Sequence, residues 1–292
     1  MADPHDKHSG NLAANDAQGS TSADTPADST PLDNDSHDQR FSRLRAGRER
    51  FRQRGIYLLP NLITTAALFA GFYAIVAGIN ADFVQAALAI FVAMALDTAD
   101  GRVARMTSTE SEFGAQFDSL SDMVAFGVAP ALVAFFWGVD SLGKVGWVVT
   151  FLYMACAALR LARFNTSGEN SSFTGLASPS AAAIVACCVW VWMEYAGGQP
   201  SPFFAGCMGT VLLATALLMV SNFPYFSPKM LGVSGRVPFV TLVLVVLGFA
   251  LLLLDPPVVL LVLFTVYALS GPVLYVKQLW FSKPATPEGD NT

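Results

Sequence analysis

Histidine is almost missing from this sequence. All three histidines, His5, His8 and His37, lie in the first 39 residues. We therefore expect any general base in the rest of the chain to be a carboxylate and not an imidazole. Cysteine is also scarce, because there are only four, which fall in apolar segments without the spacing of metal ligands. We interpret them as small buried apolar residues, which excludes a disulfide framework.

Charge is the second scarce property, since only 13% of the residues are charged while 53% are hydrophobic. This balance excludes an ordinary soluble domain and predicts an all-α polytopic membrane protein. A helix needs about 20 apolar residues to cross hydrocarbon, and about eight segments between Tyr57 and Trp280 meet that length. We expect the eight helices to start near residues 57, 82, 118, 145, 179, 203, 237 and 257.

Composition divides the chain into four parts. Residues 1–39 contain mainly Ser, Thr, Asp, Gly and Ala, which predicts a disordered tail, and they lack the apolar core of a cleaved secretion signal. Residues 40–55 carry seven arginines and three large apolar residues, so they form either a basic amphipathic helix on the membrane surface or a plain topology anchor. Residues 56–281 form the transmembrane domain, and residues 282–292 form a second tail.

The basic residues are distributed unevenly between the two membrane sides. With eight spans, the N-terminal arginines and nearly all later Lys and Arg residues fall on one side, and only Lys144 falls on the other. The positive-inside rule then places both termini in the cytoplasm. We expect a multi-pass protein of the cell (inner) membrane, with no nucleic-acid partner.

Four aspartates stand in the stretch LDTADGRVARMTSTESEFGAQFDSLSD, which joins the second and third predicted spans: Asp97, Asp100, Asp118 and Asp122. Spacings of three and four residues place each pair on one helix face, so two helices can direct four carboxylates into a shared cavity. An unpaired charge in a bilayer costs about 2.5 to 3.5 kcal/mol on insertion scales, so a cation is expected between them. An all-oxygen site suits Mg2+, Mn2+ or Ca2+, and four carboxylates can hold two such ions.

The residues between the acids are small or cationic. Gly101 and Ala104 leave one helix face without bulk, which admits a ligand close to the backbone. Arg105 offers a planar fork for phosphate oxygens. Gly114 would likewise let a ligand approach the backbone of the connecting loop closely. The stretch is therefore typical of a site for a phosphorylated ligand.

These residues fit the pattern D-x2-D-G-x2-A-R-x8-G-x3-D-x3-D in full, and the stretch resembles the signature of the CDP-alcohol phosphotransferases. The resemblance implies that Asp97, Asp100 and Asp118 bind two divalent cations, and that Asp122 completes the metal site and acts as general base. It implies a CDP-diacylglycerol donor with direct attack on its phosphorus and release of CMP. It also implies a six-helix core with a C-terminal helical pair, membrane lipids as surroundings, and a homodimer.

A second stretch, LPNLIT, begins the first predicted span and resembles a turn that holds the nucleotide end of the donor in the same family. By this resemblance, the CDP-lipid pocket is lined by Pro60, Asn61, Thr64, Gly101, Ala104, Arg105 and Gly114. The short turn alone is weak evidence, since Pro is common at helix starts. The turn supports a nucleotide site only because the same sequence also contains the acidic pattern.

The acceptor alcohol must be chosen by residues outside the acidic pattern. Arg160 and Arg163 in RLARFN lie about one turn apart, and either could bind a carboxylate or a phosphate, or serve only as a topology anchor. RLARFN, the GLxxPxAAA turn and LMVSNFPYFSPK, which ends at Lys229, resemble the membrane-integral bacterial phosphatidylserine synthases. The resemblance implies L-serine as acceptor. Relatives often have proline where this chain has Ala177, and glycerol 3-phosphate, inositol, inositol phosphate and choline stay open as acceptors.

Two other classes of protein compete with an enzyme. Acids within a membrane also occur in cation transporters, but the later spans supply no acids to continue an ion path. A scaffold that recruits partners through the N-terminal tail gives no reason for four clustered acids. The sequence therefore favours a lipid-synthesising enzyme.

Overall fold

The computed structural model describes residues 59–107, 111–166, 174–225 and 239–281, all within one of the two compact units of the chain, Phe51–Thr292. The predicted N-terminal tail, basic segment and C-terminal tail lie outside the described residues, as does Lys229. The described part contains helices and no β-strand beyond one isolated bridge between Thr174 and Pro224, so the predicted all-α class is confirmed.

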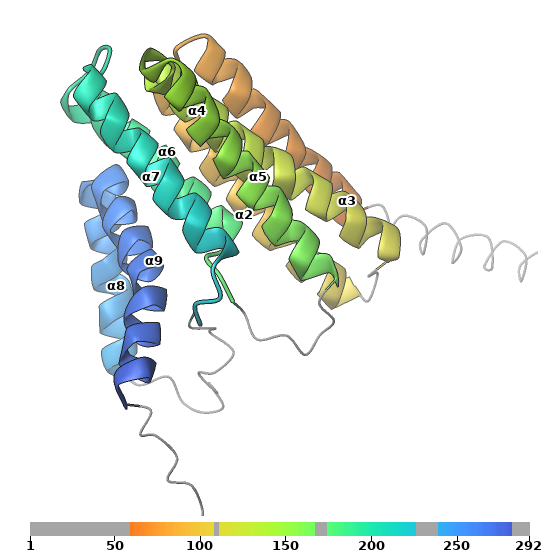
Figure 1. Cartoon of the computed structure of the whole chain (residues 1–292). Helices are drawn as coiled ribbons and strands as arrows, with labels where there is room; N and C mark the ends of the chain where they lie inside the picture. The colour runs from red at the N-terminus through yellow and green to blue at the C-terminus, as the bar shows by residue number, and fades with distance from the viewer. Residues whose placement is uncertain (1–58, 108–110, 167–173, 226–238, 282–292) are drawn as a thin grey trace, which may run out of the picture. The chain divides into compact units, whose positions relative to one another are not determined.

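Eight helical segments follow one another in the described part, and Figure 1 colours them in chain order. They are a first helix, Leu59–Ile79; α2, Phe83–Thr107; α3 to α4, Glu112–Trp137; α5, Lys144–Thr166; α6, Ser178–Tyr195; α7, Pro202–Val220; α8, Phe239–Leu254; and α9, Pro256–Phe281. Six of them are long and apolar enough to cross a membrane, and α6 and α8 are shorter, with 18 and 16 residues.

Large apolar side chains cover the outside of these helices. Phe69 is 65% exposed, Phe151 67% and Val240 66%, and many other Leu, Val and Phe side chains are similarly uncovered. In water such a surface would drive aggregation, whereas in lipid it has no cost. The protein is therefore a multi-pass membrane protein.

The third helix begins six residues before the predicted start near residue 118, and the five other helices whose preceding residue is described (α2, α5, α6, α7 and α9) begin within one residue of their predicted starts. Its first turns are polar, and Ser111 caps them by accepting a hydrogen bond of 3.0 Å from the backbone N–H of Gly114. Hydrophobicity alone misses this start because the helix begins outside the apolar stretch. The result is that Asp118 and Asp122 lie in the body of α3, Glu112–Asp122, and not at its beginning.

A π-helical segment, η1, Met123–Val128, follows Asp122 directly and joins α3 to α4, Ala129–Trp137. Its Phe126 carbonyl accepts a 3.2 Å hydrogen bond from the hydroxyl of Tyr153, a fully buried residue of α5. The first helix contacts η1 at backbone distance, because a Cβ built on Gly71 would lie 2.8 Å from the Cα of Ala125. Such single-turn π segments are frequent at functional sites.

Two loops at the aspartate-bearing end of the helices are joined to each other. The backbone N–H of Gly175 donates to the Phe223 carbonyl at 3.0 Å, and that of Leu176 donates to the Leu218 carbonyl in α7 at 2.9 Å. Gly175 has a φ of +84° and approaches the Met219 carbonyl closely, so this turn requires glycine. The loop before α6 therefore caps the end of α7.

The prediction for the cysteines is wrong at one position. Cys156 and Cys187 are buried and Cys188 is half-buried, but Cys207 on α7 is exposed. A cysteine is apolar enough to face lipid, so exposure on a membrane helix carries no polar cost.

Candidate active site

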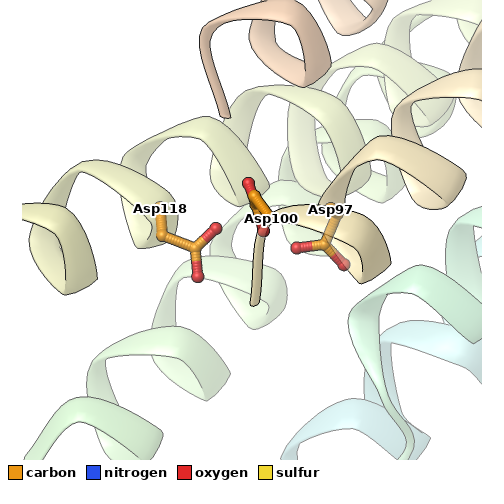
Figure 2. Close-up of side chains that lie close together, drawn as sticks. All are labelled: Asp97, Asp100 and Asp118. Atoms are coloured by element: carbon orange, nitrogen blue, oxygen red, sulfur yellow. The ribbon is translucent and has the colours of Figure 1, made fainter. Parts of the chain in front are cut away.

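Carboxylates from two helices meet at one point of the fold. Asp97 and Asp100 lie one turn apart near the end of α2, and Asp118 comes from α3. One carboxylate oxygen of each lies within 4.8 Å of one from the others, a spacing at which the three could share a metal ion. Figure 2 shows the three side chains turned toward a common space. The predicted convergence of the acidic pattern is therefore present in the structure.

Asp122 joins this group through Asp97. It is not among the three residues whose oxygens could share one ion, but its carboxyl group lies beside that of Asp97. Asp122 therefore belongs to the same cluster of acids.

The first helix is tied to the acids by two hydroxyl groups. Thr64 Oγ1 lies 2.7 Å from Asp100 Oδ2 and 3.0 Å from the Pro60 carbonyl oxygen, so its proton can go to either acceptor. Ser121 Oγ donates to the Thr64 carbonyl at 3.2 Å. Thr64, Asp100 and Ser121 are all buried, with 4%, 3% and 2% of their surface exposed. These contacts fix the first helix, α2 and α3 against one another at the acids.

Among the described residues, no cationic side chain forms an ion pair or a hydrogen bond with the acids. Within the part of the chain that the structure describes, none of the four forms an ion pair, and Asp118 Oδ1 is buried without a hydrogen-bond partner. Clustered carboxylates with a buried unpaired oxygen are costly unless a cation lies between them. The donor set is all oxygen, which suits a hard divalent ion. Asp97, Asp100 and Asp118 therefore fit the predicted metal site.

A cavity of about 270 Å³ opens beside the acids, between the first helix, α2 and α3. Its lining contains all seven residues that the sequence assigns to the CDP-lipid pocket. The full lining is Pro60, Asn61, Thr64, Asp100, Gly101, Ala104, Arg105, Ser111, Gly114, Ala115 and Asp118. Sequence reasoning missed Ser111 and Ala115, although a serine three residues before a glycine at a helix start is a recognisable capping signal.

The two glycines of the cavity differ in how much room they leave. A Cβ on Gly114 would lie 3.1 Å from Ser111 Oγ and 3.4 Å from Asn61 Oδ1, so an alanine there would require these side chains to shift by a few tenths of an ångström. A Cβ on Gly101 would meet only the Arg105 guanidinium, at an ordinary 3.7 Å. Arg105 bends back along its helix, and its Nε donates to the Gly101 carbonyl at 3.0 Å. The open space above Gly101 is therefore available to a ligand.

The two candidate arginines have different surroundings. Arg160 is half-buried, its Nη1 donates to Ser178 Oγ at 3.0 Å, and its charge interacts with the Asp122 carboxyl. Arg163 is exposed and donates from Nη2 to Thr174 Oγ1 at 3.0 Å, which holds the loop before α6. Arg160 is thus bound to the start of α6, within electrostatic range of Asp122, and Arg163 lies at the loop before α6. Sequence reasoning missed Ser178 as a partner of Arg160, and only its place at the start of α6 could have suggested it.

Comparison with known proteins agrees with this site. A sequence model of the CDP-alcohol phosphatidyltransferase family matches residues 57–221, which include the four aspartates and the cavity. A CDP-diacylglycerol-serine O-phosphatidyltransferase of Helicobacter pylori is 38% identical over 226 residues, covering 76% of this chain and 92% of its own. The protein of the same description in Mycobacterium bovis is 34% identical over 79% of this chain and 83% of its own. An archaetidylserine synthase of Methanothermobacter thermautotrophicus is 33% identical over 57% of this chain and 69% of its own.

Proposed function

Because the chain belongs to the CDP-alcohol phosphatidyltransferase family, we propose that it transfers the phosphatidyl group of CDP-diacylglycerol to the hydroxyl group of L-serine. The products are phosphatidylserine and CMP. The observation that carries the proposal is the meeting of the aspartates from α2 and α3 beside a cavity with the predicted nucleotide-pocket residues. Serine as acceptor rests on the relatives, whose alignment covers most of both chains.

Asp97, Asp100 and Asp118 would hold divalent cations, with Asp122 completing the set, and Mg2+ and Mn2+ fit these oxygen donors best. When bound, such ions neutralise charge on the diphosphate and on the leaving CMP. The protein holds the carboxylates in fixed positions, and the hydrogen bond between Thr64 and Asp100 is part of this support. If two ions bind, Asp122 would complete the protein ligands of the pair.

The donor headgroup would occupy the cavity between the first helix and α2. Asn61 and Arg105 supply an amide and a guanidinium at its wall, and Gly101 and Ala104 allow the diphosphate to approach the helix backbone. The lipid chains would extend into the membrane from the same cleft. In this arrangement the acids would lie at the depth of a lipid headgroup.

Asp122 would take the proton of the serine hydroxyl. The hydroxyl oxygen forms a bond to the phosphatidyl phosphorus, and the phosphoanhydride bond to CMP breaks, while the proton passes to the Asp122 carboxylate. Its position beside Asp97, at the edge of the candidate metal ligands, supports this role. Nearby, the buried Nε of Arg160 has no hydrogen-bond partner in the described part of the chain, so a substrate carboxylate would satisfy it.

The test is CMP release by purified protein in detergent with CDP-diacylglycerol and Mn2+ or Mg2+. Serine is compared with glycerol 3-phosphate, inositol, inositol phosphate and choline as acceptor. We expect serine-dependent release that falls by a factor of about 10² to 10⁴ in Asp122→Asn, the range typical of a lost general base. Asp140→Asn, which changes an exposed aspartate in the 138–143 turn, is the matched control and should keep full activity.

Each other outcome has a defined meaning. Release with a different alcohol would retain the transferase chemistry and overturn serine as acceptor. If no alcohol gives CMP release, the proposed transferase function would be contradicted, and an ion-transport role for the acids would be favoured. Full activity in Asp122→Asn would remove Asp122 as the base.

A further inference from the structure

Helix α5 is joined at two points to the segment formed by α3 and η1. Near the end of α5, Asn165 Nδ2 donates a hydrogen bond to Ser119 Oγ in α3 at 3.0 Å. Further back along α5, the Tyr153 hydroxyl donates to the Phe126 carbonyl in η1 at 3.2 Å. The stretch of α5 between these two points therefore runs antiparallel beside the stretch of α3 and η1 between them.

Asp122 and Arg160 lie on these two facing stretches, one on each. Arg160 Nη1 donates to Ser178 Oγ at 3.0 Å, and its buried Nε has no hydrogen-bond partner in the described ranges. Of the described residues, Asp100 and Asp118 line the donor cavity, whereas Asp122 and Arg160 do not. The proposed base and the arginine are thus both available to an acceptor outside the space assigned to the donor.

Ser178 is a fixed partner for this arginine. It begins α6, is only 1% exposed, and follows a loop that is bonded along its length. The backbone N–H groups of Gly175 and Leu176 donate to carbonyls in and after α7, and Thr174 Oγ1 accepts from Arg163 at 3.0 Å. A long arginine side chain has many rotamers, so an acceptor held in this way at its tip restricts its orientation.

We propose that Ser178 is a positioning residue for the acceptor, because its hydroxyl group holds the Arg160 guanidinium with Nε available to the carboxylate of the incoming amino acid. The inference rests on the proposed function, since it takes the acceptor to be an amino acid with a free carboxylate. A guanidinium binds a carboxylate through a planar fork, so its orientation matters as well as its charge. The loop before α6 thereby takes part in acceptor recognition without touching the acceptor.

The first experiment measures steady-state CMP release by Ser178→Ala in the full-length protein. The change removes the hydroxyl group that binds Arg160 and puts a good helix former at the start of α6. We expect the KM for serine to rise by about tenfold, the loss typical of one hydrogen bond to a charged group, while kcat and the KM for CDP-diacylglycerol stay within about twofold.

Thr174→Val is the matched control. It removes the hydroxyl group that binds the exposed Arg163 at the other end of the same loop and keeps the branched shape of the side chain. Its KM for serine should stay within about twofold of that of the unmodified protein. A larger rise in Thr174→Val than in Ser178→Ala would overturn the inference, because the loop would then act through Arg163.

A second measurement uses L-serinamide, which has the hydroxyl and amino groups of serine but no carboxylate. Its inhibition constant against serine should stay within about twofold in Ser178→Ala, because serinamide has no carboxylate for Arg160 to bind. A general distortion of the site would weaken serine and serinamide equally, and that result would also overturn the inference.

The remaining outcomes separate this inference from the proposed function. An unchanged KM for serine in Ser178→Ala would overturn the positioning role while leaving the transferase intact. If the unmodified protein releases no CMP with serine, the proposed function fails instead, and the two failures are thereby distinguished.

Discussion

At the scale of single residues, the site consists of carboxylates whose positions are fixed by hydrogen bonds from neighbouring side chains. Thr64 binds Asp100, and Ser121 binds the backbone of Thr64, so two small hydroxyl groups hold the carboxylates in place. A metal site in which the protein fixes the ligands by further hydrogen bonds keeps its geometry without the metal. Substitutions of single residues can therefore separate effects on ligand binding from effects on folding.

Gly101→Ala is the sharpest of these tests. The new methyl group meets no protein atom closer than 3.7 Å, so the helix should be neutral or more stable by up to about 1 kcal/mol. The methyl group would nevertheless enter the space that we assign to the diphosphate, so we expect the KM for CDP-diacylglycerol to rise at least about tenfold, or about 1.4 kcal/mol. Thermal unfolding and CMP release are measured on the same preparation.

Gly206→Ala is the control for that variant. Gly206 lies on α7 with nothing within 4 Å of a built Cβ, so the substitution should affect stability in the same direction and leave both KM values unchanged. Equal activity of the two variants would contradict the assignment of the space above Gly101 to the donor.

Asp118→Asn tests the metal site. The change removes a charge but keeps the shape of the side chain, so we expect the concentration of Mn2+ or Mg2+ for half-maximal CMP release to rise about 10-fold to 100-fold, as for a weakened ligand set. Glu112→Gln changes an exposed acid on the same helix and should leave the metal dependence alone. A parallel shift in both variants would indicate general surface electrostatics in place of ligation.

At the scale of helices, the fold could be predicted from the sequence wherever an apolar segment has clear ends. The starts of α2, α5, α6, α7 and α9 agree within one residue because hydropathy and Pro, Gly or Asn-Ala-Asp breaks mark them. The start of α3 could not be found in that way, since its first turns are polar and capped by Ser111. The π-helical turn after Asp122 also has no signal in composition, because it depends on packing against Gly71 and Tyr153.

The candidate site also has a part that the sequence predicts and a part that it does not. The acids and the cavity residues lie close in sequence or carry a spaced pattern, so the sequence predicts them. The hydrogen bond from Arg160 to Ser178 in α6, and the one from Ser121 in α3 to Thr64 in the first helix, join residues from different helices. A contact between residues on separate helices leaves no periodicity or spacing in a single sequence. It becomes visible only when the helices are packed.

The contact between the first helix and η1 gives a prediction at this scale. A methyl group added in Gly71→Ala would lie 2.8 Å from the Ala125 Cα, which is backbone and can move only with η1. We expect a loss of roughly 1–3 kcal/mol in the free energy of unfolding, as for overpacking of a core. We also expect lower activity, because the shift would disturb the hydrogen bond between Ser121 and the Thr64 carbonyl. Thermal unfolding and CMP release would report both. Gly248→Ala on α8, where nothing lies within 4 Å, should lower neither stability nor activity; similar losses in both variants would contradict the close contact.

At the scale of the whole molecule, one side of the protein combines basic charge with the chemistry. The acids, Arg160 and the joined loops all lie where α2 and α5 end and α3 and α6 begin. The opposite ends carry the 138–143 turn and Lys144. By the positive-inside rule we propose that the site side faces the cytoplasm, where free serine and released CMP are available.

Site-directed labelling tests this orientation. In a variant without its four native cysteines, Thr166→Cys marks the site side and Asp140→Cys marks the opposite side, and both positions are exposed. A membrane-impermeant maleimide should label Thr166→Cys only in inverted vesicles and Asp140→Cys only in intact cells. A cysteine-free protein that still releases CMP is the control for folding. The reverse labelling pattern would place the active site outside the cytoplasm, and the positive-inside argument would then be wrong for this protein.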